Sequence, residues 1–238
     1  DAFTSHFESR LVMDVVELLA RLDIRMFVAP FQPNGKPLHV QGFLGRFERV
    51  AARQAARLRT LSRFGVPLVG IDPAMTLTYR QEYVKTLGPQ AVPEVLLLQE
   101  WLLSLGQSIL PRGWRDEATG TDPGYRLMSH CTEKTNAPGS PKGWQQLFAH
   151  FGLQLDLIAT GCCGMSGTYG HEARNRDTSE KIYDLSWREP VEDDANTGRL
   201  LATGYSCRSQ VKRLSDRTLP HPLQALLKWI KIADGSIN

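Results

Sequence analysis

The clearest indication of the fold class is the segment of residues 155–164, which reads LDLIATGCCG. Its first five residues have the length and apolar composition of a buried strand. The turn that follows places two cysteines side by side, and Gly164 can adopt the positive φ that lets a backbone approach an inorganic centre closely. Open α/β folds bind ligands at the carboxyl ends of their strands. The sequence therefore predicts an α/β fold with a thiol site at one edge of a sheet.

Strands and helices alternate on both sides of this segment. In the second half, strands are expected at 125–129, 155–159 and 199–203, a loop at 130–140, and helices at 141–151, from the cysteine pair toward Trp187, from about Cys207, and at 223–230. In the first half, helices are expected at about 4–22, 42–62 and 92–105 and after Asp72-Pro73, with strands at 24–29 and 68–71. Strands that alternate with helices indicate parallel sheets.

The chain also reads as two related halves. Residues 22–35 align without a gap onto residues 151–164, and 69–74 falls near 201–207. Residues 111–124 are rich in Gly, Pro, Asp, Thr and Arg without periodicity, which is typical of a connection. We therefore expect a first repeat without cysteines at 1–110, a linker at 111–124, and a second repeat with the cysteine site at 125–238.

All four cysteines lie in the second half, as Cys131, Cys162, Cys163 and Cys207. They sit at or just after predicted strand ends, where three loops can converge. Thiolates are the soft ligands that zinc and iron–sulfur clusters prefer. The alternatives are ordinary buried cysteines, a strained vicinal disulfide, or thiol–disulfide chemistry at the adjacent pair.

The pattern Cys131, Gly161-Cys162-Cys163-Gly164, Cys207 resembles the cysteine-rich "CCG" domain found in heterodisulfide reductase, in the iron–sulfur subunit of glycolate oxidase and in lactate-utilisation proteins. The chain is still more similar to the C-terminal region of the large bacterial FAD-linked D-2-hydroxyglutarate dehydrogenases. The stretches that carry this resemblance are DAFTSHF, PNGKPLHVQGFLGRF, GIDPAMTLTYRQEY, HCTEKT, GCCGMSGTYGHEARN and LATGYSCRSQVKR, and they span nearly the whole chain.

The resemblance implies that the four cysteines bind a four-iron cluster or zinc, and that the domain transfers electrons in an oxidoreductase acting on D-2-hydroxy acids. It also implies upstream FAD-binding and ferredoxin-like domains on the same polypeptide, and an electron acceptor. Under the alternative, the domain holds structural zinc or no metal, and caps or docks the flavin domain. The first residue, Asp1, is read as the start of a fragment of a longer product, and the fragment alone is not expected to turn over substrate.

Two departures from the family pattern affect this interpretation. In the first repeat the family's paired cysteines would fall at Pro33 and Asn34, its leading cysteine near Ala2 or Phe3, and its later one near Ala74. That repeat therefore has no thiol ligand and is expected to be scaffold. In the second repeat the closing CxxC is replaced by Cys207-Arg208-Ser209-Gln210, which leaves four thiols, enough for a tetrahedral zinc or one cluster.

Several polar residues near these loops are accessory candidates. His130 and His171 are possible ligands or proton carriers, with ordinary loop histidines as the alternative. Arg208 is a possible partner for cluster charge or a carboxylate, with a salt bridge as the alternative. We also expect six polar residues of the first half to form a wall that faces the cysteines: Asn34, Lys36, His39, Asp72, Arg80 and Glu82. Trp144, Trp187 and Trp229 are expected in the core or an interface.

Composition excludes several other classes of protein. The formal charge is +3 and the basic residues are scattered, which disfavours a nucleic-acid partner. No apolar run approaches the roughly 20 residues needed to cross a bilayer. Hydrophobic content of 42% is ordinary for a packed domain, and so few cysteines favour a reducing cytoplasm over a secreted disulfide scaffold.

Overall fold

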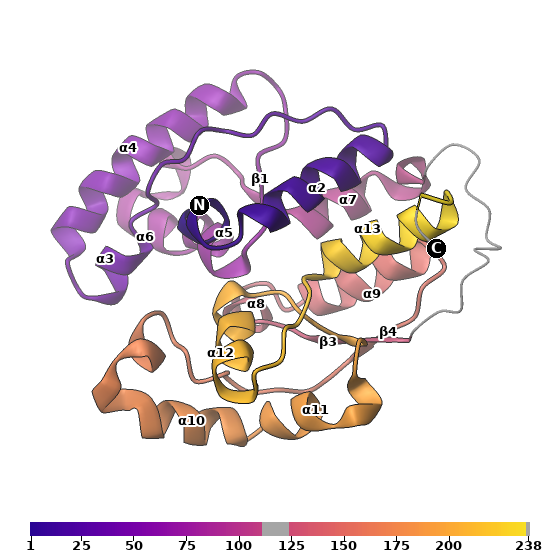
Figure 1. Cartoon of the computed structure of the whole chain (residues 1–238). Helices are drawn as coiled ribbons and strands as arrows, with labels where there is room; N and C mark the ends of the chain where they lie inside the picture. The colour runs from indigo at the N-terminus through magenta and orange to yellow at the C-terminus, as the bar shows by residue number, and fades with distance from the viewer. Residues whose placement is uncertain (111–123, 237–238) are drawn as a thin grey trace.

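The computed structural model describes residues 1–110 and 124–236. Figure 1 shows the arrangement of the elements. The predicted connection at 111–124 lies outside the described residues, apart from Gly124. The first half contains α1 (Ala2–His6), α2 (Ser9–Arg21), α3 (Lys36–Val40), α4 (Leu44–Ser62), β1 (Val69–Gly70), α5 (Pro73–Arg80), α6 (Glu82–Leu87), β2 (Leu96–Leu97) and α7 (Leu98–Ser104).

The second half carries the longer strands. It contains β3 (Tyr125–Met128), α8 (Cys131–Asn136), α9 (Ser140–His150), β4 (Leu155–Leu157), α10 (Arg176–Asp184), α11 (Arg188–Glu192), β5 (Leu200–Ala202), α12 (Tyr205–Ser215) and α13 (Pro222–Ala233). Short 3₁₀ turns lie at Pro89–Ala91, Gly106–Ile109, Tyr169–His171, Ala173–Asn175 and Asp194–Asn196.

Both described sheets are parallel, which confirms the α/β class. In the first half β1 pairs with β2, and in the second half the strand order is β4-β3-β5. The central strand β3 places Leu127 opposite Leu157 of β4 and Leu201 of β5. Because the three strands run in one direction, the segments that follow them all leave from the same edge of the sheet.

The largest core joins the two halves. Helix α13 of the second half packs on α2 of the first, and α7 of the first half packs on α9 of the second (Figure 1). Trp144 and Trp229 lie in this core, and Trp187 lies in a second core with Cys163 and Cys207. The three tryptophans are 4% exposed or less, which confirms their predicted burial.

Several predicted elements differ from the structure. The single helix expected at 4–22 is two helices, which are separated at Phe7 and Glu8. The Asp1 side chain caps the first of them by accepting bonds from the Phe3 and Thr4 N–H groups. The expected loop at 130–140 contains α8, which the His130 ring caps at its start. Histidine is not among the preferred capping residues, so residue type did not indicate this helix.

One strand prediction and one helix prediction also differ from the structure. Residues 24–29 have no strand partner among the described residues. The helix expected at 92–105 begins only at Leu98, because Leu96 and Leu97 pair with β1 and the Glu100 carboxylate accepts the Leu97 N–H. No helix in the described part of the chain is both long and apolar enough to cross a bilayer.

Candidate thiol site

The three-stranded sheet delivers all four cysteines to its carboxyl edge. Cys131 begins α8 shortly after β3, and Cys162 and Cys163 follow β4. Cys207 lies in the first turn of α12, shortly after β5. Residues that are far apart in the sequence are therefore brought to one end of one sheet, which is where parallel folds position functional groups.

The four sulfurs form a continuous chain of contacts. Cys131 is within hydrogen-bond reach of Cys162, Cys162 of Cys163, and Cys163 of Cys207. All four are free thiols. Cys163 and Cys207 are 2% and 1% exposed, whereas Cys131 and Cys162 are partly exposed. The site therefore reaches from the core to the surface.

Hydrogen bonds among the thiols shift their pKa values in opposite directions. Donation from Cys131 and then Cys163, with help from the Gly164 N–H, lowers the pKa of Cys162. The pKa of Cys131 is raised by its hydrogen bond with Cys162 and then by partial burial. The pKa of Cys163 is raised by its hydrogen bonds with Cys162 and Cys207 and then by burial. These contacts favour the charged form at Cys162 and the protonated form at Cys131 and Cys163.

The turn that carries the cysteine pair is held by its neighbours. Gly164 has φ +86°, and a Cβ there would lie 2.2 Å from the Ser179 carbonyl oxygen. The Ser179 hydroxyl donates to the Gly164 carbonyl at 2.8 Å. At the other end of the turn, the Gly161 N–H donates to the Ser186 hydroxyl and the Trp187 indole donates to the Gly161 carbonyl. These positioning residues were missed from the sequence, because no local pattern links them to the turn.

His130 lies beside the thiols but is committed to structural bonds. Its Nδ1 accepts the Thr132 N–H at 3.1 Å, and its Nε2 lies 3.1 Å from the Ser206 hydroxyl. Burial lowers the pKa of the ring, so the neutral form is favoured. His171 is exposed on a 3₁₀ turn. The described contacts connect His171 to none of the four sulfurs.

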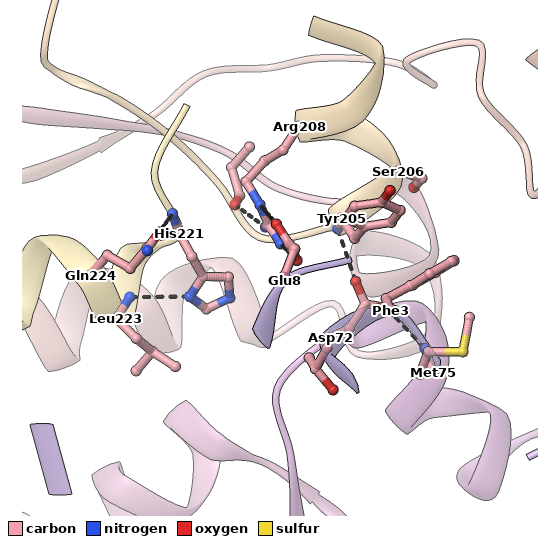
Figure 2. Close-up of polar contacts among 12 residues, drawn as sticks. Phe3, Glu8, Asp72, Met75, Tyr205, Ser206, Arg208, His221, Leu223 and Gln224 are labelled. Carbon is pink, nitrogen blue, oxygen red and sulfur yellow. Dashed lines mark hydrogen bonds and ion pairs between the residues drawn. The ribbon is translucent and has the colours of Figure 1, made fainter. Parts of the chain in front are cut away.

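Arg208 forms a buried ion pair rather than a contact with the thiols. Its side chain is 7% exposed, and the guanidinium donates to both carboxylate oxygens of Glu8 (Figure 2). The guanidinium also donates to the Ala202 carbonyl at 2.7 Å. Of the two alternatives considered from the sequence, the salt bridge is the one the structure shows. The pair connects α12 of the second half with the start of α2 in the first.

A buried carboxylate near the thiols was also missed from the sequence. Glu133 is 1% exposed and accepts hydrogen bonds from the hydroxyl of Ser140, the indole of Trp144 and the hydroxyl of Thr203. Thr203 also accepts the His130 N–H at 3.0 Å. Glu133 therefore connects α8 to the end of β5 and fixes where Cys131 begins its helix.

The six residues expected to form a polar wall are mostly paired within the first half. Lys36 pairs with Glu82 and Arg80 with Glu100, Asn34 bonds to main-chain groups and to Met75, and the His39 ring packs edge-on against Phe47. Asp72 alone among the six bonds to an element that carries a cysteine. Its carboxylate accepts the Met75 N–H of α5 and the Tyr205 N–H of α12 (Figure 2).

The donor set fits a thiolate-bound metal in its chemistry. Four soft thiols, with main-chain N–H groups of Gly164 and Met165 directed at Cys162 and Cys163, suit such a centre. Within residues 1–110 and 124–236, however, no group of three or more His, Cys, Asp or Glu side chains is arranged to hold a metal ion as it stands. The sulfurs contact one another in sequence instead, and a metal must displace the thiol protons and draw the four sulfurs toward one point.

Fold and site together define an α/β domain that presents four thiols at the carboxyl edge of a parallel sheet. Comparison with known proteins identifies its relatives. The chain is 54% identical over 229 residues to a D-2-hydroxyglutarate dehydrogenase from Pseudomonas putida, and 44% identical over 232 residues to the one from Escherichia coli. These matches cover 96% and 97% of the chain and 22% of each relative. The chain is a homologue of a region of these dehydrogenases, which confirms the resemblance stated from the sequence.

A more distant relative belongs to another dehydrogenase. The chain is 24% identical over 202 residues to one subunit of the anaerobic glycerol-3-phosphate dehydrogenase from Escherichia coli, covering 81% of the chain and 48% of that protein. No family model and no solved structure matches the chain. The chain spans about a fifth of the length of the D-2-hydroxyglutarate dehydrogenases it matches.

Proposed function

We propose that this chain is an electron-transfer domain of a larger FAD-linked oxidoreductase, and that Cys131, Cys162, Cys163 and Cys207 hold its iron–sulfur centre. The observation that carries the proposal is the contact chain of four free thiols at one sheet edge. An iron–sulfur centre bound there supplies a one-electron carrier whose potential depends on ligands, burial and hydrogen bonds.

The protein's own groups are suited to tune such a centre. Cys163 and Cys207 lie in the core, so their side of the site is dry, while Cys131 and Cys162 reach the surface, where an electron can enter or leave. The N–H groups of Gly164 and Met165 direct positive dipole ends at the sulfurs and favour their charged form. These are the ligand, burial and hydrogen-bond effects that a protein supplies to a redox centre.

The identity of the relatives supports electron transfer over substrate binding. Two of them are named for D-2-hydroxyglutarate and a third for glycerol-3-phosphate, which are different substrates. A region shared by dehydrogenases with different substrates is suited to a step that both need. The whole protein is accordingly proposed to oxidise a D-2-hydroxy acid at FAD in an upstream domain, and to pass electrons through a ferredoxin-like segment and this site to an acceptor in the cytoplasm.

Metal retention by matched variants tests the proposal. Wild type, Cys163→Ser and Met165→Leu are purified without oxygen, and iron and sulfide are measured per chain. Met165 is 1% exposed and lies two residues from Cys163, so it controls for disturbance of the same turn. We expect iron and sulfide to be retained in wild type and Met165→Leu and lost in Cys163→Ser. Equal metal content in wild type and Cys163→Ser overturns the assignment.

A second candidate is a structural zinc site. It is favoured by the direct contact between neighbouring sulfurs, since four thiolates around one ion form a small tetrahedral shell. In that case the domain caps or docks the flavin domain and carries no electrons. One zinc per chain, without iron, sulfide or visible absorption, identifies this alternative.

A further inference from the structure

The two halves repeat the same local backbone where their second helices end. After α2 the Ile24 N–H donates to the Leu19 carbonyl, and after α9 the Leu153 N–H donates to the Phe148 carbonyl. The residue before each donor is left-handed, with φ +57° at Asp23 and φ +71° at Gly152. Residues 22–24 and 151–153 are the same positions that the sequence alignment pairs. The helix ends of the two halves therefore agree in sequence register and in geometry.

The agreement continues at the turn that carries the cysteine pair. Gly35 and Gly164 occupy equivalent positions and have φ of +76° and +86°. Just before them, the Asn34 side chain accepts the Lys36 N–H at 3.0 Å, as the Cys163 sulfur accepts the Met165 N–H. The first half thus preserves the shape of the thiol turn, with an amide in place of a thiol.

The residue that contacts this turn lies at an equivalent position in the two halves. The Asn34 amide lies 3.4 Å from the Met75 sulfur, as Cys163 contacts Cys207. Met75 and Cys207 are both the third residue of their helices, α5 and α12, and those helices follow β1 and β5. By this correspondence β1 is the counterpart of β5, and residues 26–28 are the counterpart of β4.

One strand of the second half has no counterpart in the first. In the second half β3 lies between β4 and β5 and pairs with both. In the described residues, nothing pairs with residues 26–28, and β1 pairs only with β2. Exposure reflects the difference: Met26 is 39% exposed against 4% for Leu155, and Val69 is 37% exposed against 0% for Leu201. Apolar strand edges left open in this way invite another strand.

The second half also indicates where the absent strand connects. There β3 ends at Met128, two residues before His130, whose side chain caps α8. In the first half Asp1 caps α1 in the same manner. A strand that precedes α1 in the way that β3 precedes α8 would end just before Asp1. The relatives are longer polypeptides, of which this chain spans 22%.

We propose that residues 26–28 and β1 are the outer strands of a second three-stranded parallel sheet, whose central strand is the extended segment joined to Asp1 in the longer polypeptide. The segment is expected to be short and apolar like β3, because it replaces solvent over Met26 and Val69. The proposal concerns the fold of the first half and is independent of any metal at the four cysteines.

Amide hydrogen exchange tests the pairing in two forms of the protein: residues 1–238 alone, and a longer polypeptide with its natural residues before Asp1. We expect residues 24–29 to exchange freely in the first form and to be protected in the second, to the degree seen for residues 153–158. Free exchange in both forms overturns the proposal. Protection in both forms also overturns it, since a second copy of the chain or another segment then covers the edge.

Two proline variants of the longer polypeptide test the register. Ala29 corresponds to Ile158, whose N–H donates to Leu127 of β3, and Val28 corresponds to Leu157, whose N–H points away from β3. Proline removes the N–H donor. Ala29→Pro is expected to abolish the protection of residues 24–29, and Val28→Pro to preserve it. Loss in both variants, or in neither, contradicts a pairing that uses only one of the two N–H groups.

Discussion

The Asp72 carboxylate accepts the Tyr205 N–H at 2.9 Å, so one side chain of the first half caps the helix that carries Cys207 (Figure 2). The same carboxylate accepts the Met75 N–H at 3.1 Å and caps its own helix, α5. A buried carboxylate between two helix starts is well placed, because both ends present unpaired N–H groups and positive dipole ends. The relationship ties the two halves together next to the thiol site.

Replacing this carboxylate is expected to weaken the whole domain. Asp72→Ala leaves the buried Met75 N–H and the partly buried Tyr205 N–H without their acceptor, and it should lower the free energy of unfolding by about 2–4 kcal/mol. Asp72→Asn keeps one side-chain oxygen and should cost less. Urea unfolding measures both, with Asp177→Ala on the exposed face of α10 as the control. A loss for Asp72→Ala no greater than that of the control contradicts the double role.

The thiol turn is expected to reject a side chain at its glycine. Gly164→Ala places a Cβ 2.2 Å from a main-chain oxygen at φ +86°, so strain and a clash add together. Gly152→Ala has φ +71° but nothing within 4 Å, so it controls for the backbone strain alone. Thermal unfolding should show a clearly larger drop in Tm for Gly164→Ala than for Gly152→Ala. Similar drops would show that the Ser179 contact does not hold the turn.

The buried ion pair between the halves is expected to be strongly coupled. Arg208→Ala should cost about 3–5 kcal/mol of unfolding free energy, because it leaves the Glu8 carboxylate and the Ala202 carbonyl without their donor. Glu8→Ala should cost less, since Glu8 is 18% exposed and Arg208 keeps its bond to Ala202. A double-mutant cycle measures the coupling, expected at about 1–3 kcal/mol. If the free-energy losses of the two single variants simply add in the double variant, the two side chains do not interact in solution.

Stability is expected to fall in mild acid because of buried histidine. His221 is fully buried, and burial, then the charge of Arg208, lowers its pKa well below the usual 6.5. The unfolded chain therefore binds a proton below about pH 6.5 that the folded chain does not, and stability decreases as pH falls. His130 contributes with the same sign.

The variant His221→Asn isolates the contribution of this residue. Asparagine can still accept the Leu223 N–H and cap α13, but it does not titrate. Unfolding free energies measured from pH 7.5 to 5.5 should show a shallower decline in His221→Asn than in wild type. The slope removed is at most about 1.4 kcal/mol per pH unit. Parallel slopes would mean that His221 becomes protonated in the folded protein.

Local sequence predicted the parts of the fold that depend on local patterns. The strand before the cysteine pair, the glycine turn and the helix after Asp72-Pro73 all follow from apolar runs and turn residues, and the structure contains them. The approach of the four sulfurs follows from a general rule on parallel sheets. The prediction of secondary structure failed where contacts with distant residues determine the local structure. Leu96 and Leu97 form a strand because β1 lies beside them, and His130 caps a helix that residue type does not indicate.

The surroundings of the site could not be predicted in the same way. Glu133, Ser179 and Arg208 each have their partners in another element, up to 200 residues away along the chain. Arg208 and His130 lie close to cysteines in sequence, yet their side chains are used for packing and capping. Proximity in sequence therefore indicated the region of the site but not the role of each neighbour.

In the proposed function, the four cysteines that follow the three parallel strands hold one iron–sulfur centre. Iron, zinc and acid-labile sulfide are measured per chain in protein purified without oxygen, together with the visible absorption spectrum. If this assignment is right, the protein contains iron and sulfide in similar amounts and little zinc, and it shows a broad visible absorption that fades on reduction. Protein that contains neither iron nor sulfide when prepared in this way, with all four thiols free to react, would contradict it.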